Sequence, residues 1–124
     1  MSNSRASTSG VATAKREGDT WVLDGTKQFI SNGSEAGVAV AITVTDPAAG
    51  RHGFTFFLLD PSGPGYRVLR VEDKLGQQTA HTAQIQLDGL RLGDDAVLGK
   101  VGGGYRLVME ALSDGRIAIA AQAV

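Results

Sequence analysis

Residues Gly18–Gly33, GDTWVLDGTKQFISNG, combine strand-forming side chains with glycine-containing turn signals. Trp21–Leu23 favours one strand and Phe29–Ile30 favours a second, because aromatic and β-branched residues are enriched in strands. Asp24-Gly25 lies between them and is typical of a two-residue hairpin turn, whose central residues need positive φ. Asn32-Gly33 predicts a further tight turn where the second arm ends. The stretch therefore predicts a β-hairpin around which the other strands are arranged.

The second arm of this hairpin carries a candidate binding site. Strand side chains alternate between faces, so Phe29 and Ser31 are expected to share one face and Ile30 the other. A ring and a hydroxyl beside exposed backbone donors suit a flat ligand with polar edges. The alternative interpretation is a structural hairpin in which Phe29 fills the core and Ser31 is solvated.

Composition limits the classes of function. The chain has 124 residues, of which 42% are hydrophobic and 20% charged, enough for one globular domain with a core. Its net charge of −1 gives no sign of nucleic-acid binding, which relies on clustered positive charge. The absence of cysteine excludes disulfides and thiolate chemistry. His52 and His81 are far apart, so we expect no metal site. His81 also has no acidic neighbour in the sequence, which predicts a surface histidine.

No apolar run in the sequence reaches the length of a membrane span. Residues 1–10 lack the apolar core of a signal peptide and predict a flexible N-terminal segment. A cytoplasmic location is therefore expected.

Glycines separate short apolar runs along most of the chain, which is typical of strands joined by tight turns. Residues 38–44 predict a strand covered on both faces. The strand predicted over 82–87 alternates, and Asp88-Gly89 predicts a second hairpin turn before a short returning strand over 90–92. Further strands are predicted over the ranges 11–17, 54–59 and 66–71. The fold class expected is mainly β, with about seven or eight short strands forming two packed antiparallel sheets or an open barrel.

The character of the sequence changes near its C-terminal end. Residues 102–104 are consecutive glycines and predict a hinge, and apolar residues from Tyr105 onward follow the helical period. Ser113, Asp114 and Gly115 are expected to interrupt this helix. The final run IAIAAQAV has no capping signal, which predicts a truncated C-terminal helix and hence a fragment of a longer protein.

Several blocks of the sequence resemble the acyl-CoA dehydrogenase family, in the family's own order. DGTKQFISNG at 24–33 resembles "NGTK-x-W-I-T-N-G", and EDKLG at 72–76 resembles "E-D-K-L-G". SDGRIAIAAQA at 113–123 resembles "D-x-G-R-I-x-I-A-A-Q-A". The resemblance implies a β-domain over 11–101, like the middle domain of that family, and the start of its C-terminal helical domain over 102–124.

The resemblance also implies a function. Family members use FAD to remove two hydrogens from an acyl-CoA thioester and pass electrons to an electron-transfer flavoprotein. Phe29, Ile30 and Ser31 match the flavin-contacting "W-I-T", with Phe for Trp and Ser for Thr. The segment beside the substrate would correspond to Ser113, Asp114, Gly115 and Arg116.

The resemblance places no catalytic residue in this chain. In one branch of the family the catalytic glutamate stands at the position of Gly115, and glycine cannot act as a base, so the base is expected outside the chain. The full-length protein is expected to be a homo-oligomer without a metal. Two alternatives remain: a flavin-dependent oxidase or monooxygenase on the same scaffold, and a non-catalytic β-domain that binds a protein partner through residues 117–124.

Overall fold

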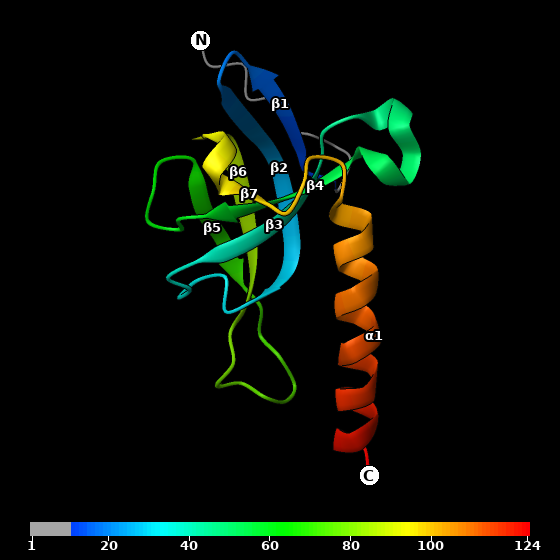
Figure 1. Ribbon diagram of the computed structural model, residues 1–124. Helices are drawn as coiled ribbons and strands as arrows, with labels where there is room; N and C mark the ends of the chain where they lie inside the picture. The colour runs from blue at the N-terminus through cyan, green and yellow to red at the C-terminus, as the bar shows by residue number, and fades with distance from the viewer. Residues whose placement is uncertain (1–10) are drawn as a thin grey trace.

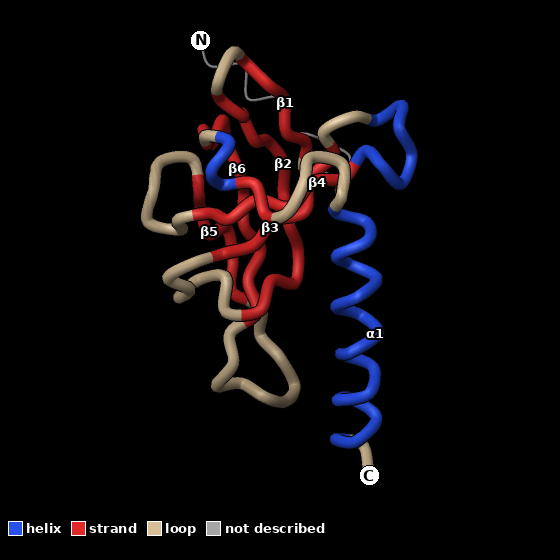
Figure 2. Tube along the Cα trace, in the orientation of Figure 1, coloured by secondary structure: helices blue, strands red, loops and turns tan. Residues whose placement is uncertain are grey.

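The computed structural model describes residues 11–124, and its elements are shown in Figure 1 and Figure 2. The predicted flexible segment over residues 1–10 lies outside the described residues. Seven strands, two short 3-10 helices and one α-helix follow one another in the described chain. In order they are β1 (Thr13–Glu17), β2 (Thr20–Ser31), β3 (Ala39–Val44), η1 (Pro47–Gly53), β4 (Phe54–Leu59), β5 (Tyr66–Val71), β6 (Thr82–Leu92), η2 (Asp94–Ala96), β7 (Val97–Leu98) and α1 (Gly104–Gln122).

The strands form one open sheet in the order β5-β6-β2-β1-β3-β4-β7. The predicted fold class is confirmed: the chain is mainly β, its sheet is open, and a helix follows. Of the two arrangements left open by the sequence, the open barrel is the nearer one, because all seven strands belong to one open sheet and not to two packed sheets. All neighbours are antiparallel except β1 and β3, which are parallel and joined at Thr13 and Val44.

The predicted hairpin is wrong in one respect. Its turn lies at Gly18-Asp19, between β1 and β2, and β2 runs straight through Asp24-Gly25. The second predicted turn, Asp88-Gly89, likewise lies inside the continuous strand β6. The two dipeptides meet: Asp88 and Gly89 form a bulge opposite Asp24, whose carboxylate accepts a hydrogen bond from the Gly89 backbone at 2.7 Å. Glycine supplies positive φ to bulges as well as to turns, so the sequence signal was ambiguous.

The core lies on one face of the sheet. In β3 the residues Ala39, Ala41 and Thr43 are buried whereas Val40 is 52% exposed, so the prediction of a strand covered on both faces is wrong. The predicted alternation of β6 is confirmed, with Ala83, Ile85 and Leu87 inward. The remaining large core side chains are Trp21, Leu23, Phe57, Leu59, Tyr66 and Leu90.

The helix α1 stands beside the sheet and extends beyond it at its C-terminal end (Figure 1). The expected interruption at 113–115 is wrong, because α1 is continuous from Gly104 to Gln122. One glycine costs only about 1 kcal/mol inside a helix, which neighbouring alanine and leucine residues offset. Gly104 is the buried residue of α1, and a Cβ there would lie 2.8 Å from the Phe54 carbonyl oxygen. No helix among residues 11–124 is long and apolar enough to cross a membrane.

An ion-pair cluster fixes η2 against the first hairpin. Asp94 accepts two hydrogen bonds from the Arg16 guanidinium, at 2.9 and 2.7 Å, and a third from the Trp21 indole at 2.8 Å. The hydrogen bonds from Arg16 first, and then from Trp21, hold the pKa of the Asp94 carboxyl below its ordinary value. The folded state therefore binds a proton at Asp94 less tightly than the unfolded chain does.

This cluster predicts a pH dependence of stability. The contribution of Asp94 is complete above its ordinary pKa of about 4 and is lost as the pH falls through the lower folded-state value. Asp94→Asn should remove that part of the dependence, so the stabilities of variant and wild type converge in acid. Urea denaturation between about pH 2 and pH 7 measures this, since the linkage operates across that range. A constant difference at all pH values would contradict the assignment.

Candidate functional site

The end of β2 departs from regular strand geometry at Phe29. Lys27 pairs with Ile85 and Ile30 with Ala83, so Gln28 and Phe29 together oppose Gln84 in a β-bulge. Phe29 has φ of 58° and its side chain is 70% exposed. Positive φ is uncommon for a bulky residue and costs roughly 1–3 kcal/mol. The interpretation in which Phe29 fills the core is therefore wrong, and the simple alternation from Phe29 to Ser31 is interrupted by the bulge.

Ile30 and the turn after it are held firmly. Ile30 packs against the core, and a Cβ at Gly33 would lie 3.1 Å from the Ile30 side chain. The Tyr66 hydroxyl donates a hydrogen bond to the Gly33 carbonyl at 2.7 Å, and burial raises the Tyr66 pKa. The Asn32 backbone donates to the His81 carbonyl at 2.7 Å. The predicted turn at Asn32-Gly33 is confirmed, and it fixes the residues that precede it.

Ser31 ends β2 with its side chain exposed. Its hydroxyl makes no hydrogen bond to another residue within 11–124. A hydroxyl can both donate and accept, so Ser31 can serve a polar ligand edge beside the exposed Phe29 ring. Phe29, Ile30 and Ser31 thus lie together at one end of the sheet, with the middle residue as the anchor.

Four polar side chains, which we name the glutamine network, cross three strands at the level of the bulge. Gln84 donates to the Gln28 side-chain oxygen at 3.1 Å, and Gln28 donates to Glu72 at 3.3 Å. Arg70 donates to the same Glu72 oxygen at 3.2 and 2.7 Å. None of these residues was predicted as functional from the sequence, and the alternating polar positions in β6 are the one signal that pointed to this surface.

Lys27, just before the bulge, connects β2 to β3. Its ammonium donates to the Ile42 carbonyl of β3 at 2.9 Å, across the part of the sheet that β1 does not fill. Removal from water lowers the Lys27 pKa. The contact thus links β2 to β3 beyond the segment of β2 that pairs with β1.

His81 has an acidic neighbour that only the fold provides. Its Nδ1 lies 2.7 Å from a carboxylate oxygen of Glu35 and 3.3 Å from the Ser34 hydroxyl. The histidine is 39% exposed at its side chain, so the prediction of a surface position holds. The cluster borders the turn that follows Ser31.

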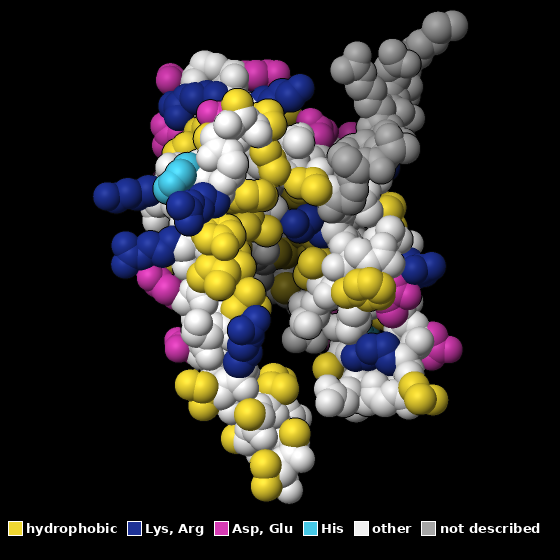
Figure 3. Space-filling view, turned by 90° about the vertical axis from the view of Figure 1, so that its right-hand side faces the viewer, with side chains coloured by type: hydrophobic (Ala, Val, Ile, Leu, Met, Phe, Trp, Pro, Cys, Tyr) yellow, Lys and Arg dark blue, Asp and Glu magenta, His cyan; other side chains and the backbone are white. Residues whose placement is uncertain are grey.

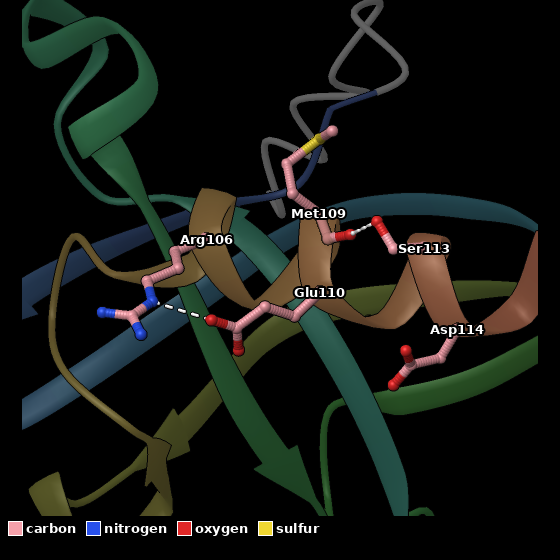
Figure 4. Close-up of a pocket in the computed structure, with 5 residues that line it drawn as sticks. All are labelled: Arg106, Met109, Glu110, Ser113 and Asp114. Carbon is pink, nitrogen blue, oxygen red and sulfur yellow. Dashed lines mark hydrogen bonds and ion pairs between the residues drawn. The ribbon is translucent and has the colours of Figure 1, made fainter.

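The second group of predicted site residues lies on α1. Ser113 and Asp114 line a surface depression of about 530 Å³, together with Arg106, Met109 and Glu110 (Figure 4). Arg106 donates to Glu110 at 2.8 Å and Ser113 donates to the Met109 carbonyl at 2.9 Å. Gly115 and Arg116 are exposed but do not line the depression.

The additional lining residues Glu110 and Met109 occur three and four positions before Ser113, and Arg106 occurs four and three positions before those two. Such spacing places side chains on one helix face, so the helical period could have identified them. Glu110 forms its ion pair with Arg106 and not with Arg116.

The structure does not bring the two groups into one pocket. The depression at Ser113 is lined by α1 alone, and the main contacts of α1 are with β4 and η1. Figure 3 shows the surface hollowed between the helix and the lower part of the sheet, with hydrophobic side chains along the helix down to its free end. Leu112 and Ile117 on that helix are 49% and 73% exposed.

Known proteins are similar to this chain in sequence and in fold. The family described as "Acyl-CoA dehydrogenase, middle domain" matches residues 2–90. Human mitochondrial short-chain specific acyl-CoA dehydrogenase is 42% identical over 112 residues, which is 90% of this chain and 27% of that protein. Butyryl-CoA dehydrogenase of Megasphaera elsdenii has a TM-score of 0.86 at 35% identity, over 90% of this chain and 30% of that chain.

A further solved structure, described as the electron transferring flavoprotein of Acidaminococcus fermentans, gives a TM-score of 0.86 at 38% identity. The match covers 99% of this chain and 33% of that one. The chain therefore spans about a third or less of the length of the relatives that it matches. Because the family pattern covers most of the sequence, and the fold matches those of solved relatives with a TM-score of 0.86, the chain belongs to the acyl-CoA dehydrogenase family and carries its middle domain.

Proposed function

We propose that the full-length protein is an FAD-dependent acyl-CoA dehydrogenase and that this chain supplies one side of its flavin site. The bound flavin would take up the two hydrogens removed from the α and β carbons of the acyl-CoA. Phe29, Ile30 and Ser31 would hold the flavin, with Phe29 against the isoalloxazine face, Ile30 as the half-buried anchor and Ser31 at a polar edge.

One observation carries this proposal: a large aromatic ring is held out of the core, in a strained backbone conformation, next to a hydroxyl without a partner in the described chain. Strain of this kind persists where the surrounding structure enforces it and is frequent at ligand sites. Phe29 is 70% exposed, so its ring is available to a ligand. The residues present therefore fit a flat, partly polar ligand such as isoalloxazine.

The role of Ser31 follows from its chemistry. A hydroxyl that donates to a flavin edge stabilises the negative charge that accumulates there on reduction, without rearranging during the reaction. The tightly bonded turn after Ser31 limits how far the hydroxyl can move. We assign no catalytic base to this chain, since Gly115 stands at one family position for it.

The helix is proposed as the substrate side of the site. Ser113, Asp114, Gly115 and Arg116 are exposed, and the Arg116 guanidinium has no ion-pair partner among residues 11–124. A free guanidinium is suited to phosphate groups such as those of coenzyme A. We propose that these residues contact the acyl-CoA in the full-length protein.

The names of the relatives bear on the substrate and the cellular location. Names such as short-chain specific and butyryl-CoA dehydrogenase favour a short acyl substrate. An electron-transfer flavoprotein as electron acceptor stays a prediction from the family resemblance. The expected cytoplasmic location and homo-oligomeric state stay predictions, and the human relative is described as mitochondrial.

The visible spectrum of the purified full-length protein tests the proposal. We expect bound yellow flavin that bleaches when butyryl-CoA is added without oxygen, more readily than with palmitoyl-CoA. Readmission of oxygen separates a dehydrogenase, whose reduced flavin persists, from an oxidase. A folded, colourless protein that takes up no added FAD would refute the flavoenzyme function.

Substitution of Ser31 tests its role in the same protein. Ser31→Ala should slow bleaching by butyryl-CoA about tenfold, which is the effect of one lost hydrogen bond in the transition state. Ser31→Thr keeps the hydroxyl and introduces the family's own residue, so it should react like the wild type. Equal rates for Ser31→Ala and the wild type in a stopped-flow experiment would exclude this hydrogen bond.

A second candidate function is supported by the exposure of α1. Ile117 and Ile119 are 73% and 64% exposed, which suits a protein-binding helix without catalysis. The spectrum described above separates the two functions, since this alternative requires no flavin.

A further inference from the structure

β6 lies between two strands that are both irregular at the level of Gln84. On one side, Gln28 and Phe29 of β2 together face Gln84. On the other side, Val68 pairs with Ile85 and Arg70 with Gln84, which leaves Leu69 as an extra residue in β5. Bulges bend a strand and re-aim its side chains, so two at one level displace both neighbours of Gln84 from regular pairing.

The glutamine network crosses the sheet at this level. The Gln28 amide is held at both ends, because its oxygen accepts from Gln84 and its nitrogen donates to Glu72. Glu72 is itself fixed by Arg70, and its side chain is only 19% exposed. The residue that opens the bulge in β2 is thus tied to the neighbouring strand β6 through Gln84 and, across β6, to Glu72 just after β5.

From this geometry we propose that Gln28, held by Gln84 and Glu72, is a positioning residue that keeps Phe29 in its left-handed conformation with the ring available to the flavin. The proposal rests on the proposed function, in which the Phe29 ring covers the isoalloxazine. A phenylalanine is more stable in extended backbone, so Phe29 tends to leave φ of 58° unless its neighbours prevent this. A change of one position in the pairing would turn its side chain to the opposite face.

Gln84→Leu in the full-length protein breaks the network while keeping the size of the side chain. Gln86→Leu is the matched control: it lies on the same strand, is half-buried like Gln84, and makes no side-chain hydrogen bond within residues 11–124. We expect Gln84→Leu to weaken FAD binding about tenfold, as one lost hydrogen bond would, and Gln86→Leu to leave it unchanged. Both variants should melt at similar temperatures.

Conservative changes and a second readout sharpen the test. Glu72→Gln keeps an acceptor oxygen for Gln28 and should retain more FAD than Glu72→Leu. Crystal structures of the variants should show φ of Phe29 becoming negative in Gln84→Leu and staying positive in Gln86→Leu. If Gln84→Leu does not fold, Gln28→Leu in the same assays decides the question.

The outcomes separate the two proposals. A wild-type protein that binds no FAD refutes the proposed function, and the positioning role with it. A wild-type protein that binds FAD, with equal affinities for Gln84→Leu and Gln86→Leu, refutes the positioning role alone. Retention of positive φ at Phe29 in Gln84→Leu also overturns it.

Discussion

Phe57→Ala is expected to lower the free energy of unfolding by about 3–5 kcal/mol. The Phe57 side chain is 0% exposed, and its ring meets that of Trp21 edge-on at 5.5 Å between centroids. Truncation removes the transfer energy of the ring and leaves a cavity that rigid strands cannot close. Because small domains are stable by only about 5–15 kcal/mol, the variant should be partly unfolded or close to it.

The position of Phe57 explains the size of this effect. Phe57 lies on β4 and Trp21 on β2, and β1 and β3 stand between these strands in the sheet. The two rings touch because the sheet curves around the core. The pair therefore connects two strands that are not neighbours in the sheet.

Leu58→Ala is the matched control for Phe57→Ala. Leu58 is the next residue of β4, points to the other face and is 39% exposed. It should cost about 1 kcal/mol or less. Urea denaturation followed by far-ultraviolet circular dichroism gives both values, and equal losses would contradict the location of the core.

Gly25→Ala is expected to cost about 3 kcal/mol or more, from two sources. Gly25 has φ of 138°, which residues with a side chain rarely adopt, and this strain alone is worth roughly 1–3 kcal/mol. A Cβ at Gly25 would also lie 2.6 Å from the Ala12 Cα, so backbone would have to move, at about 1–3 kcal/mol.

Gly18→Ala separates these two sources. Gly18 has φ of 62° in the turn between β1 and β2, and a Cβ there would meet nothing within 4 Å. It should lose only the backbone term, about 1–2 kcal/mol. Thermal and urea unfolding of both variants measures the difference, and a Gly25→Ala protein no less stable than Gly18→Ala would argue against the close approach to Ala12.

Much of the candidate site could be predicted from the sequence, because its residues are close together along the chain. Phe29–Ser31 and the turn at Asn32-Gly33 are contiguous, and residues 113–116 share one helical segment. The bulge at Phe29 could not be predicted from the sequence, since it depends on the register between β2 and β6. The partners of Gln28 come from residues far along the chain, and no local pattern specifies them.

The sequence by itself indicated where most of the strands and the long helix form, because apolar periodicity and β-branched residues act over a few neighbours. It also determined the family, through blocks whose order needs no structure. It did not reveal the short strand β7 or the two 3-10 helices. The tertiary structure decided how the glycines are used: Asp24-Gly25 and Asp88-Gly89 carry the same signal as a hairpin turn, yet they face each other in one bulge. Positive φ is a local property, but whether it reverses a chain or bends a strand depends on the strand paired with it. The same holds for Phe29, whose exposure is set by the register of β2 against β6.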